Sequence, residues 1–133
     1  MGARLSALGL SLLIAACASG AVVPSGSDSP AERLVREADG RLVASDFEGA
    51  IATYRQAIET DPEFAHAYSR LAYAQLFSPA SQAEAIEQAS LATELQPDSG
   101  RAWAYLGRAL DWNGNFDEAL LAAERAVELS PQD

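Results

Sequence analysis

A repeat of about 34 residues is the feature that most constrains the fold of this 133-residue chain. Three similar segments end in Pro62, Pro97 and Pro131, which lie 35 and 34 residues apart. Each proline follows two alanines, twelve and five residues upstream: Ala50 and Ala57, Ala85 and Ala92, and Ala119 and Ala126. Alanines seven residues apart share one face of a helix, and their small side chains let a second helix approach closely. The chain is therefore expected to fold as a stack of helical hairpins.

The third unit carries the pattern most completely. It has the spacing W-x2-L-G-x2-L at Trp103, Leu106, Gly107 and Leu110, ahead of Ala119, Ala126 and Pro131. This pattern resembles the tetratricopeptide repeat, a helix–turn–helix unit of 34 residues. The resemblance implies an all-α fold, a right-handed α-solenoid of three helix–turn–helix units, with repeats at about 31–64, 65–99 and 100–133. The six expected helices cover 30–44, 47–60, 63–77, 81–95, 98–112 and 116–129.

The repeat pattern also assigns a core and the starts of helices. The expected core holds paired helices together and comprises Ala50, Tyr54, Ala57, Leu71, Ala72, Ala85, Ala92, Trp103, Leu106, Gly107, Ala119 and Ala126. Capping boxes are expected at Ser29, Ser81 and Asn115, each followed three residues later by a glutamate. The first unit departs from the pattern at Glu37 and Arg41, where small or apolar residues are usual.

The N-terminal segment has the pattern of an export signal. Residues 5–16 form an uncharged apolar run behind Arg4, too short for a bilayer span of about 20 residues and typical of a secretory signal. The run ends in the sequence IAAC at residues 14–17, which resembles the lipobox of bacterial lipoproteins. The resemblance implies a signal peptide at 1–16, lipid on Cys17, a flexible linker over 17–29 and the repeat domain over 30–133. Three alternatives remain open: an uncleaved anchor, an ordinary secretory signal, and myristoylation of Gly2.

Composition excludes several classes of function. One cysteine and one histidine cannot form an intramolecular disulfide or a Cys/His zinc site. A net charge of −10 disfavours nucleic-acid binding, which needs an excess of cations. His66 is the only imidazole, and the nine glycines form no phosphate-binding loop. We therefore expect no catalytic residue, no metal and no cofactor.

The resemblance implies a concave groove lined by the first helix of each repeat. It places Arg36, His66, Arg70, Tyr73, Arg101, Tyr105, Arg108 and Trp112 in that groove. Arginine binds carboxylates bidentately and aromatic rings supply contact area, so the expected ligand is an extended peptide with acidic and apolar side chains. The alternative is that the arginines pair with neighbouring carboxylates and that Trp112 only closes its turn. The chaperone-tail-binding carboxylate-clamp subtype is not supported, because Val35 and Asp39 stand where it requires Lys and Asn.

These features predict a non-catalytic, protein-binding adaptor, lipid-anchored at Cys17, that assists assembly of an envelope, pilus or secretion complex. Ala18 rather than Asp follows the cysteine, so the resemblance implies the bacterial outer membrane, facing the periplasm. Alternatives are a regulatory subunit of a cell-wall enzyme, a self-associating structural element, and a soluble periplasmic or secreted protein. The apolar face around Leu120, Val127 and Leu129 lacks an obvious cover, and is either a frayed end or a surface for a homodimer or a partner.

Overall fold

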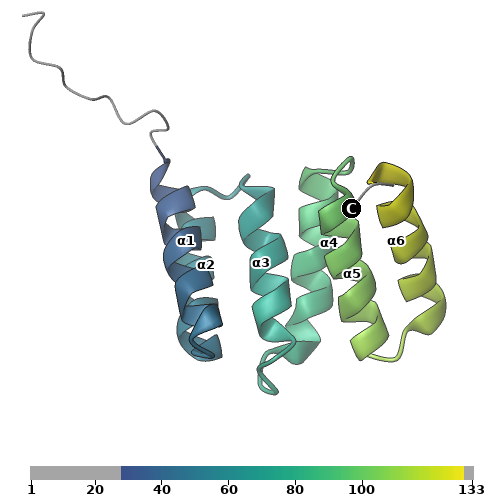
Figure 1. Ribbon diagram of the computed structural model, residues 1–133, viewed down its shortest axis with the longest axis horizontal. Coiled ribbons are helices and arrows are strands. Elements are labelled where there is room, and N and C mark those ends of the chain that lie inside the picture. Colours follow the sequence, from purple (N-terminus) through teal and green to yellow (C-terminus); the bar gives the residue numbers. More distant parts are fainter. Residues whose placement is uncertain (1–27, 131–133) are drawn as a thin grey trace, which may run out of the picture.

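The computed structural model describes residues 28–130, and this part of the chain contains six α-helices, one short 3-10 helix and no strand. The helices are α1 (Pro30–Val43), α2 (Phe47–Thr60), α3 (Ala65–Gln75), α4 (Ala85–Leu95), α5 (Gly100–Trp112) and α6 (Phe116–Leu129), with the 3-10 helix η1 (Gln82–Glu84) before α4. Figure 1 shows them following one another along the long axis of the molecule. The predicted signal, lipidation site and most of the predicted linker lie outside the described residues.

The helices pack as three successive hairpins. α1 packs on α2, α3 on α4 and α5 on α6, while α3 also packs against α2 and α1, and α5 against α4 and α3. The fold is the predicted right-handed α-solenoid of three helix–turn–helix units. Among the helices of residues 28–130, none has the length and hydropathy needed to cross a membrane.

Two apolar clusters form the core. The first joins α1, α2 and α3 through residues that include Val35, Ile51 and Leu71, and the second joins α3 to α6 through residues that include Leu76, Leu106 and Leu110. Alanines fill most remaining buried positions, which is why the helices lie close together. Of the twelve residues expected in the core, ten are buried, whereas Trp103 and Ala126 are only half-buried.

The half-buried Trp103 takes part in a hydrogen bond that recurs between repeats. Its indole N–H donates to the carbonyl of Pro97 at 2.9 Å. One repeat earlier, the hydroxyl of Tyr68 donates to the carbonyl of Pro62, also at 2.9 Å. In both repeats an aromatic side chain in the first helix therefore ties that helix to the turn before it, and this explains why Trp103 lies at the edge of the core.

One of the three predicted capping boxes forms, and the other two do not. At Ser29 the box forms, with the Glu32 carboxylate accepting from the Ser29 N–H and the Glu32 N–H donating to the Ser29 hydroxyl. Ser81 makes no such bond, because its backbone is already helical and Glu84 accepts from Arg55 and Gln75 instead. The predicted box at Asn115 is also absent, since the Asn115 side chain makes no capping hydrogen bond.

The predicted helices over 63–77, 81–95 and 98–112 are longer than α3, α4 and α5. Before α3, the Asp61 carboxylate accepts from the N–H of Glu63, and this turn holds Pro62 and Glu63 outside the helix. After Gln75 the chain continues in single turns towards Pro79, whose ring disfavours helical backbone at the preceding residue. α5 begins at Gly100 because the Ser99 hydroxyl caps it, accepting from Ala102.

Candidate functional site

A polar network centred on Arg70 connects four helices on the face formed by α1, α3 and α5. The Arg70 Nε donates a hydrogen bond to Asp39 Oδ1 at 2.8 Å, and Nη2 forms a salt bridge with the same oxygen at 2.7 Å. The Arg70 guanidinium also donates to the Tyr105 hydroxyl at 3.3 Å, and the hydroxyl of buried Tyr54 donates to the same Asp39 oxygen. Because Asp39 lies on α1, Tyr54 on α2, Arg70 on α3 and Tyr105 on α5, this network fixes the relative positions of the three repeats.

The network shifts the pKa values of its members. Burial by itself would lower the pKa of Arg70, but the hydrogen bonds to Asp39 and Tyr105 outweigh it, so the pKa lies above its ordinary value. Burial, and then the hydrogen bond to Asp39, raises the pKa of Tyr54. Arg70 is therefore a permanent cation whose charge is already matched by the carboxylate of Asp39.

Beside this network lies an open pocket of about 450 Å³ that we call the concave pocket, lined by Leu42, Val43, Arg70, Tyr73, Tyr105 and Arg108. Two guanidiniums approach the ring of Tyr73, with the carbon of Arg108 5.5 Å and that of Arg70 5.7 Å from the ring centroid. The rings of Tyr73 and Tyr105 lie 5.5 Å apart. The pocket therefore combines cations, aromatic faces and an aliphatic wall.

Four of the eight groove residues predicted from the sequence, Arg70, Tyr73, Tyr105 and Arg108, come together in this pocket. Trp112 lies beyond it, 56% exposed, with its ring 6.5 Å from that of Phe77. Phe77 in turn stacks on Phe47 at 5.2 Å and meets the edge of Tyr73 at 5.2 Å. Aromatic contacts therefore continue from the concave pocket to the turns at one end of the helices.

The other predicted groove residues lie away from the concave pocket. His66 and Arg101 line a separate hollow of about 360 Å³ together with Asp98 and Ser130. Burial, and then the charge of Arg70, lowers the pKa of His66. Arg36 is exposed on α1 and pairs with Asp28. Within residues 28–130, no three His, Cys, Asp or Glu side chains are grouped so as to hold a metal ion.

The alternative that the arginines pair internally holds for two of the four predicted groove arginines, Arg36 and Arg70. Arg36, Arg41, Arg55, Arg70 and Arg125 each pair with a carboxylate. Arg101 and Arg108 have no carboxylate partner among the residues that the structure describes. Arg108 is therefore the unneutralised cation of the concave pocket. The Tyr54–Asp39 bond was not anticipated, because no local spacing indicates a contact between residues on different helices.

Comparison with known families agrees with this architecture. A family model for "TPR repeat" matches residues 44–76, and one for "Tetratricopeptide repeat" matches residues 100–133. The chain is 36% identical over 112 residues to the small glutamine-rich tetratricopeptide repeat-containing protein 2 of Mycosarcoma maydis, covering 83% of this chain and 31% of that protein. It is 32% identical over 98 residues to the heat shock protein sti1 homolog of Schizosaccharomyces pombe, covering 74% of this chain and 16% of that protein. The chain thus spans less than a third of the length of these relatives.

Solved structures show the same fold. The Sgt2 TPR domain from Aspergillus fumigatus is 28% identical, with a TM-score of 0.74 over 78% of this chain and 69% of that one. The second TPR of Spaghetti (RPAP3), bound to the HSP90 peptide SRMEEVD, is 25% identical, with a TM-score of 0.70 over 75% of this chain and 92% of that one. Together with the matched repeats and the three stacked hairpins, these similarities establish residues 30–129 as a tetratricopeptide-repeat domain.

Proposed function

We propose that the chain is a non-catalytic adaptor that holds a peptide segment of a partner protein in the concave pocket. The observation that carries this proposal is the position of Arg108. Its guanidinium lies over the Tyr73 ring in an open pocket and has no carboxylate partner within residues 28–130. A cation placed in this way is available to a carboxylate of a ligand, to which arginine donates two parallel hydrogen bonds.

The chemistry of the pocket selects an acidic peptide that also carries apolar side chains. Leu42 and exposed Val43 supply an aliphatic wall opposite the tyrosines. Tyr73 and Tyr105 offer rigid contact area, which is typical of residues that dominate binding energy. The acidic peptide bound by the second TPR of RPAP3 supports the same class of ligand for this chain.

The pocket is suited to side-chain carboxylates of the peptide rather than to its C-terminal carboxylate. Apolar Val35 and anionic Asp39 occupy the two positions where the clamp subtype has Lys and Asn. The structure adds that Asp39 is bonded to Arg70, so a ligand carboxylate near Arg70 meets an anion already in place. The peptide SRMEEVD should therefore bind about equally well with a free and with an amidated C-terminus.

Fluorescence anisotropy with labelled SRMEEVD and the full chain tests the proposal. The neutral analogue SRMQQVN should bind at least tenfold more weakly, and Arg108→Gln should reduce the affinity for SRMEEVD by a similar factor. Arg125→Gln is the matched control, because it removes the same charge from α6, away from the pocket, and should leave affinity unchanged. Equal affinities for SRMEEVD and SRMQQVN would refute the acidic-peptide assignment. A tenfold loss on C-terminal amidation would instead favour the clamp mode.

We further propose that Cys17 anchors this adaptor by lipid to a bacterial envelope, in the outer membrane facing the periplasm, where it assists assembly of a protein complex. The support is the apolar run over 5–16, the IAAC sequence ending at Cys17 and Ala18 behind it. Mass spectrometry of the membrane-extracted protein should find a mature chain that begins at diacylated or triacylated Cys17. Recovery of an intact chain that begins at Met1 would contradict the anchor.

A further inference from the structure

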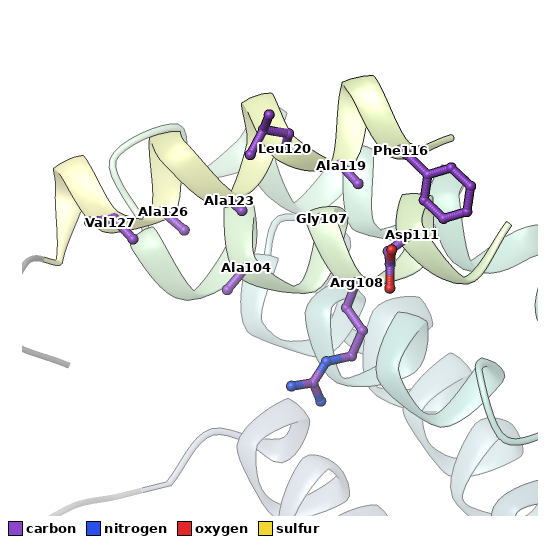
Figure 2. Close-up of a pocket in the computed structure, with 10 residues that line it drawn as sticks. All are labelled: Ala104, Gly107, Arg108, Asp111, Phe116, Ala119, Leu120, Ala123, Ala126 and Val127. Carbon is purple, nitrogen blue, oxygen red and sulfur yellow. The ribbon is translucent and has the colours of Figure 1, made fainter. Parts of the chain in front are cut away.

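The last hairpin carries a second concave surface beside the concave pocket, and Arg108 lines both. Figure 2 shows it between α5 and α6, and its volume is about 600 Å³. We call it the terminal groove. One cation, Arg108, and one anion, Asp111, line it, and the rest of its lining is small or apolar: Ala104, Gly107, Phe116, Ala119, Leu120, Ala123, Ala126 and Val127. Leu120 and Val127 are 60% and 65% exposed, which is unusual for aliphatic side chains on a shared face.

The two equivalent grooves earlier in the chain are each filled by a helix. α3 packs against α1 and α2 and buries Ala67, Leu71 and Ala74. α5 packs against α3 and α4 and buries Ala102, Leu106 and Ala109. Both helices use the same stripe: a small residue, a leucine four residues later and a small residue three residues after that. A helix with this stripe is therefore the shape that the terminal groove fits.

A second copy of this chain does not supply such a helix. Continuing the stack would place α1 of another copy in the groove, and the positions of α1 equivalent to the stripe are Arg33, Glu37 and Gly40. Burying Arg33 and Glu37 against Leu120 and Val127 would cost the hydration of two charges, whereas the stripes of α3 and α5 bury only small residues and leucine in the equivalent grooves. Head-to-tail stacking is thus disfavoured.

Charge defines the partner further. α6 carries the exposed carboxylates Asp117, Glu118 and Glu124, none of which has an ion-pair partner among residues 28–130, while Arg125 pairs with Glu128 at 2.9 Å. Two α6 helices packed together would bring these carboxylates close to one another, whereas a basic helix would neutralise them. We propose that the terminal groove binds a helix of a partner protein that carries the small–leucine–small stripe flanked by Lys and Arg.

Two synthetic peptides of about 18 residues test this, because shorter helices are marginal in water. Both carry the small–leucine–small stripe, one with Lys and one with Glu at the remaining positions, and each is titrated against the full chain by fluorescence anisotropy. The Lys peptide should bind at least tenfold more tightly than the Glu peptide. Leu120→Glu should abolish this binding. Leu121→Glu is the matched control, since Leu121 is 66% exposed on the same helix but lies outside the groove, and it should not weaken binding.

Several results would overturn the proposal, provided that circular dichroism shows unchanged helicity in the variants. Equal binding of the two peptides would show that the groove does not select a basic helix. Equal losses of affinity for Leu120→Glu and Leu121→Glu would show that the peptide does not bind in the groove. Loss of binding in Tyr73→Ala would show that the peptide binds in the concave pocket. Unchanged binding in that variant is the result expected for binding in the terminal groove. Sedimentation as a dimer that Leu120→Glu dissociates would show that a second copy covers the groove.

Discussion

Replacing Asp39 with alanine is expected to lower the free energy of unfolding by about 2–3 kcal/mol. The Asp39 carboxylate accepts one hydrogen bond from Arg70 Nε at 2.8 Å and one from Tyr54, and Arg70 Nη2 forms a salt bridge with it at 2.7 Å. A hydrogen bond to a charged group contributes about 1.5–3 kcal/mol, and removing one partner of a fully buried ion pair costs about 3–5 kcal/mol. The side chains of Asp39 and Arg70 are 36% and 20% exposed, so water compensates part of this loss and the lower range applies.

Thermal and urea denaturation followed by circular dichroism measure the effect. For a domain of this size, the loss corresponds to a fall in melting temperature of roughly 10–20 °C. Glu37→Ala is the matched control on the same helix, because the Glu37–Arg41 pair is exposed and should contribute less than about 0.5 kcal/mol. A double-mutant cycle with Arg70→Ala should give a coupling of about 1–2 kcal/mol. If Asp39→Ala costs no more than Glu37→Ala, the network does not hold the repeats together.

Three further changes have definite expected outcomes. Trp103→Ala should cost roughly 2–3 kcal/mol in urea denaturation, less than for a fully buried indole, because the side chain is half-buried; a loss under 1 kcal/mol would contradict its role in the turn. Gly40→Ala should raise the free energy of unfolding by about 0.5–1 kcal/mol, because a methyl group there meets nothing within 4 Å. Gly100→Ala should lower it, because the methyl group would overlap α6 and the residue that caps its C-terminus. Burial and the charge of Arg70 hold the pKa of His66 below the ordinary 6.5. The unfolded chain therefore takes up a proton first as the pH drops through about 6.5, and the free energy of unfolding falls. His66→Gln should make the difference in the free energy of unfolding between pH 7 and pH 5 smaller.

The architecture could be predicted from the sequence because the same spacing of alanines and proline recurs three times. Alanines at fixed distances from each proline show which face of the second helix in each hairpin packs against its neighbour. Helix starts were predicted less well. The Ser81–Glu84 spacing matches a capping box, but Glu84 is drawn into bonds with Arg55 on α2 and Gln75 on α3, which no local pattern reveals.

The sequence predicted four of the residues that line the concave pocket, but not the contacts that these residues make. Repeat positions indicate which residues lie on first helices, and Arg70, Tyr73, Tyr105 and Arg108 do share one pocket. The same positions cannot show that Asp39 neutralises Arg70. Such partners depend on the distance between neighbouring helices, which is set by packing of the whole stack rather than by local sequence.

We propose that the concave pocket binds an acidic peptide through Arg108 and the tyrosines. Isothermal titration calorimetry of the full chain and its Tyr73→Ala variant with the acidic heptapeptide used above tests it most directly. The structure predicts one binding site per chain, with affinity at least tenfold lower in the variant, about 1.4 kcal/mol, at unchanged helicity. Equal affinity of the two proteins, or no heat of binding in either across several temperatures, would contradict the account.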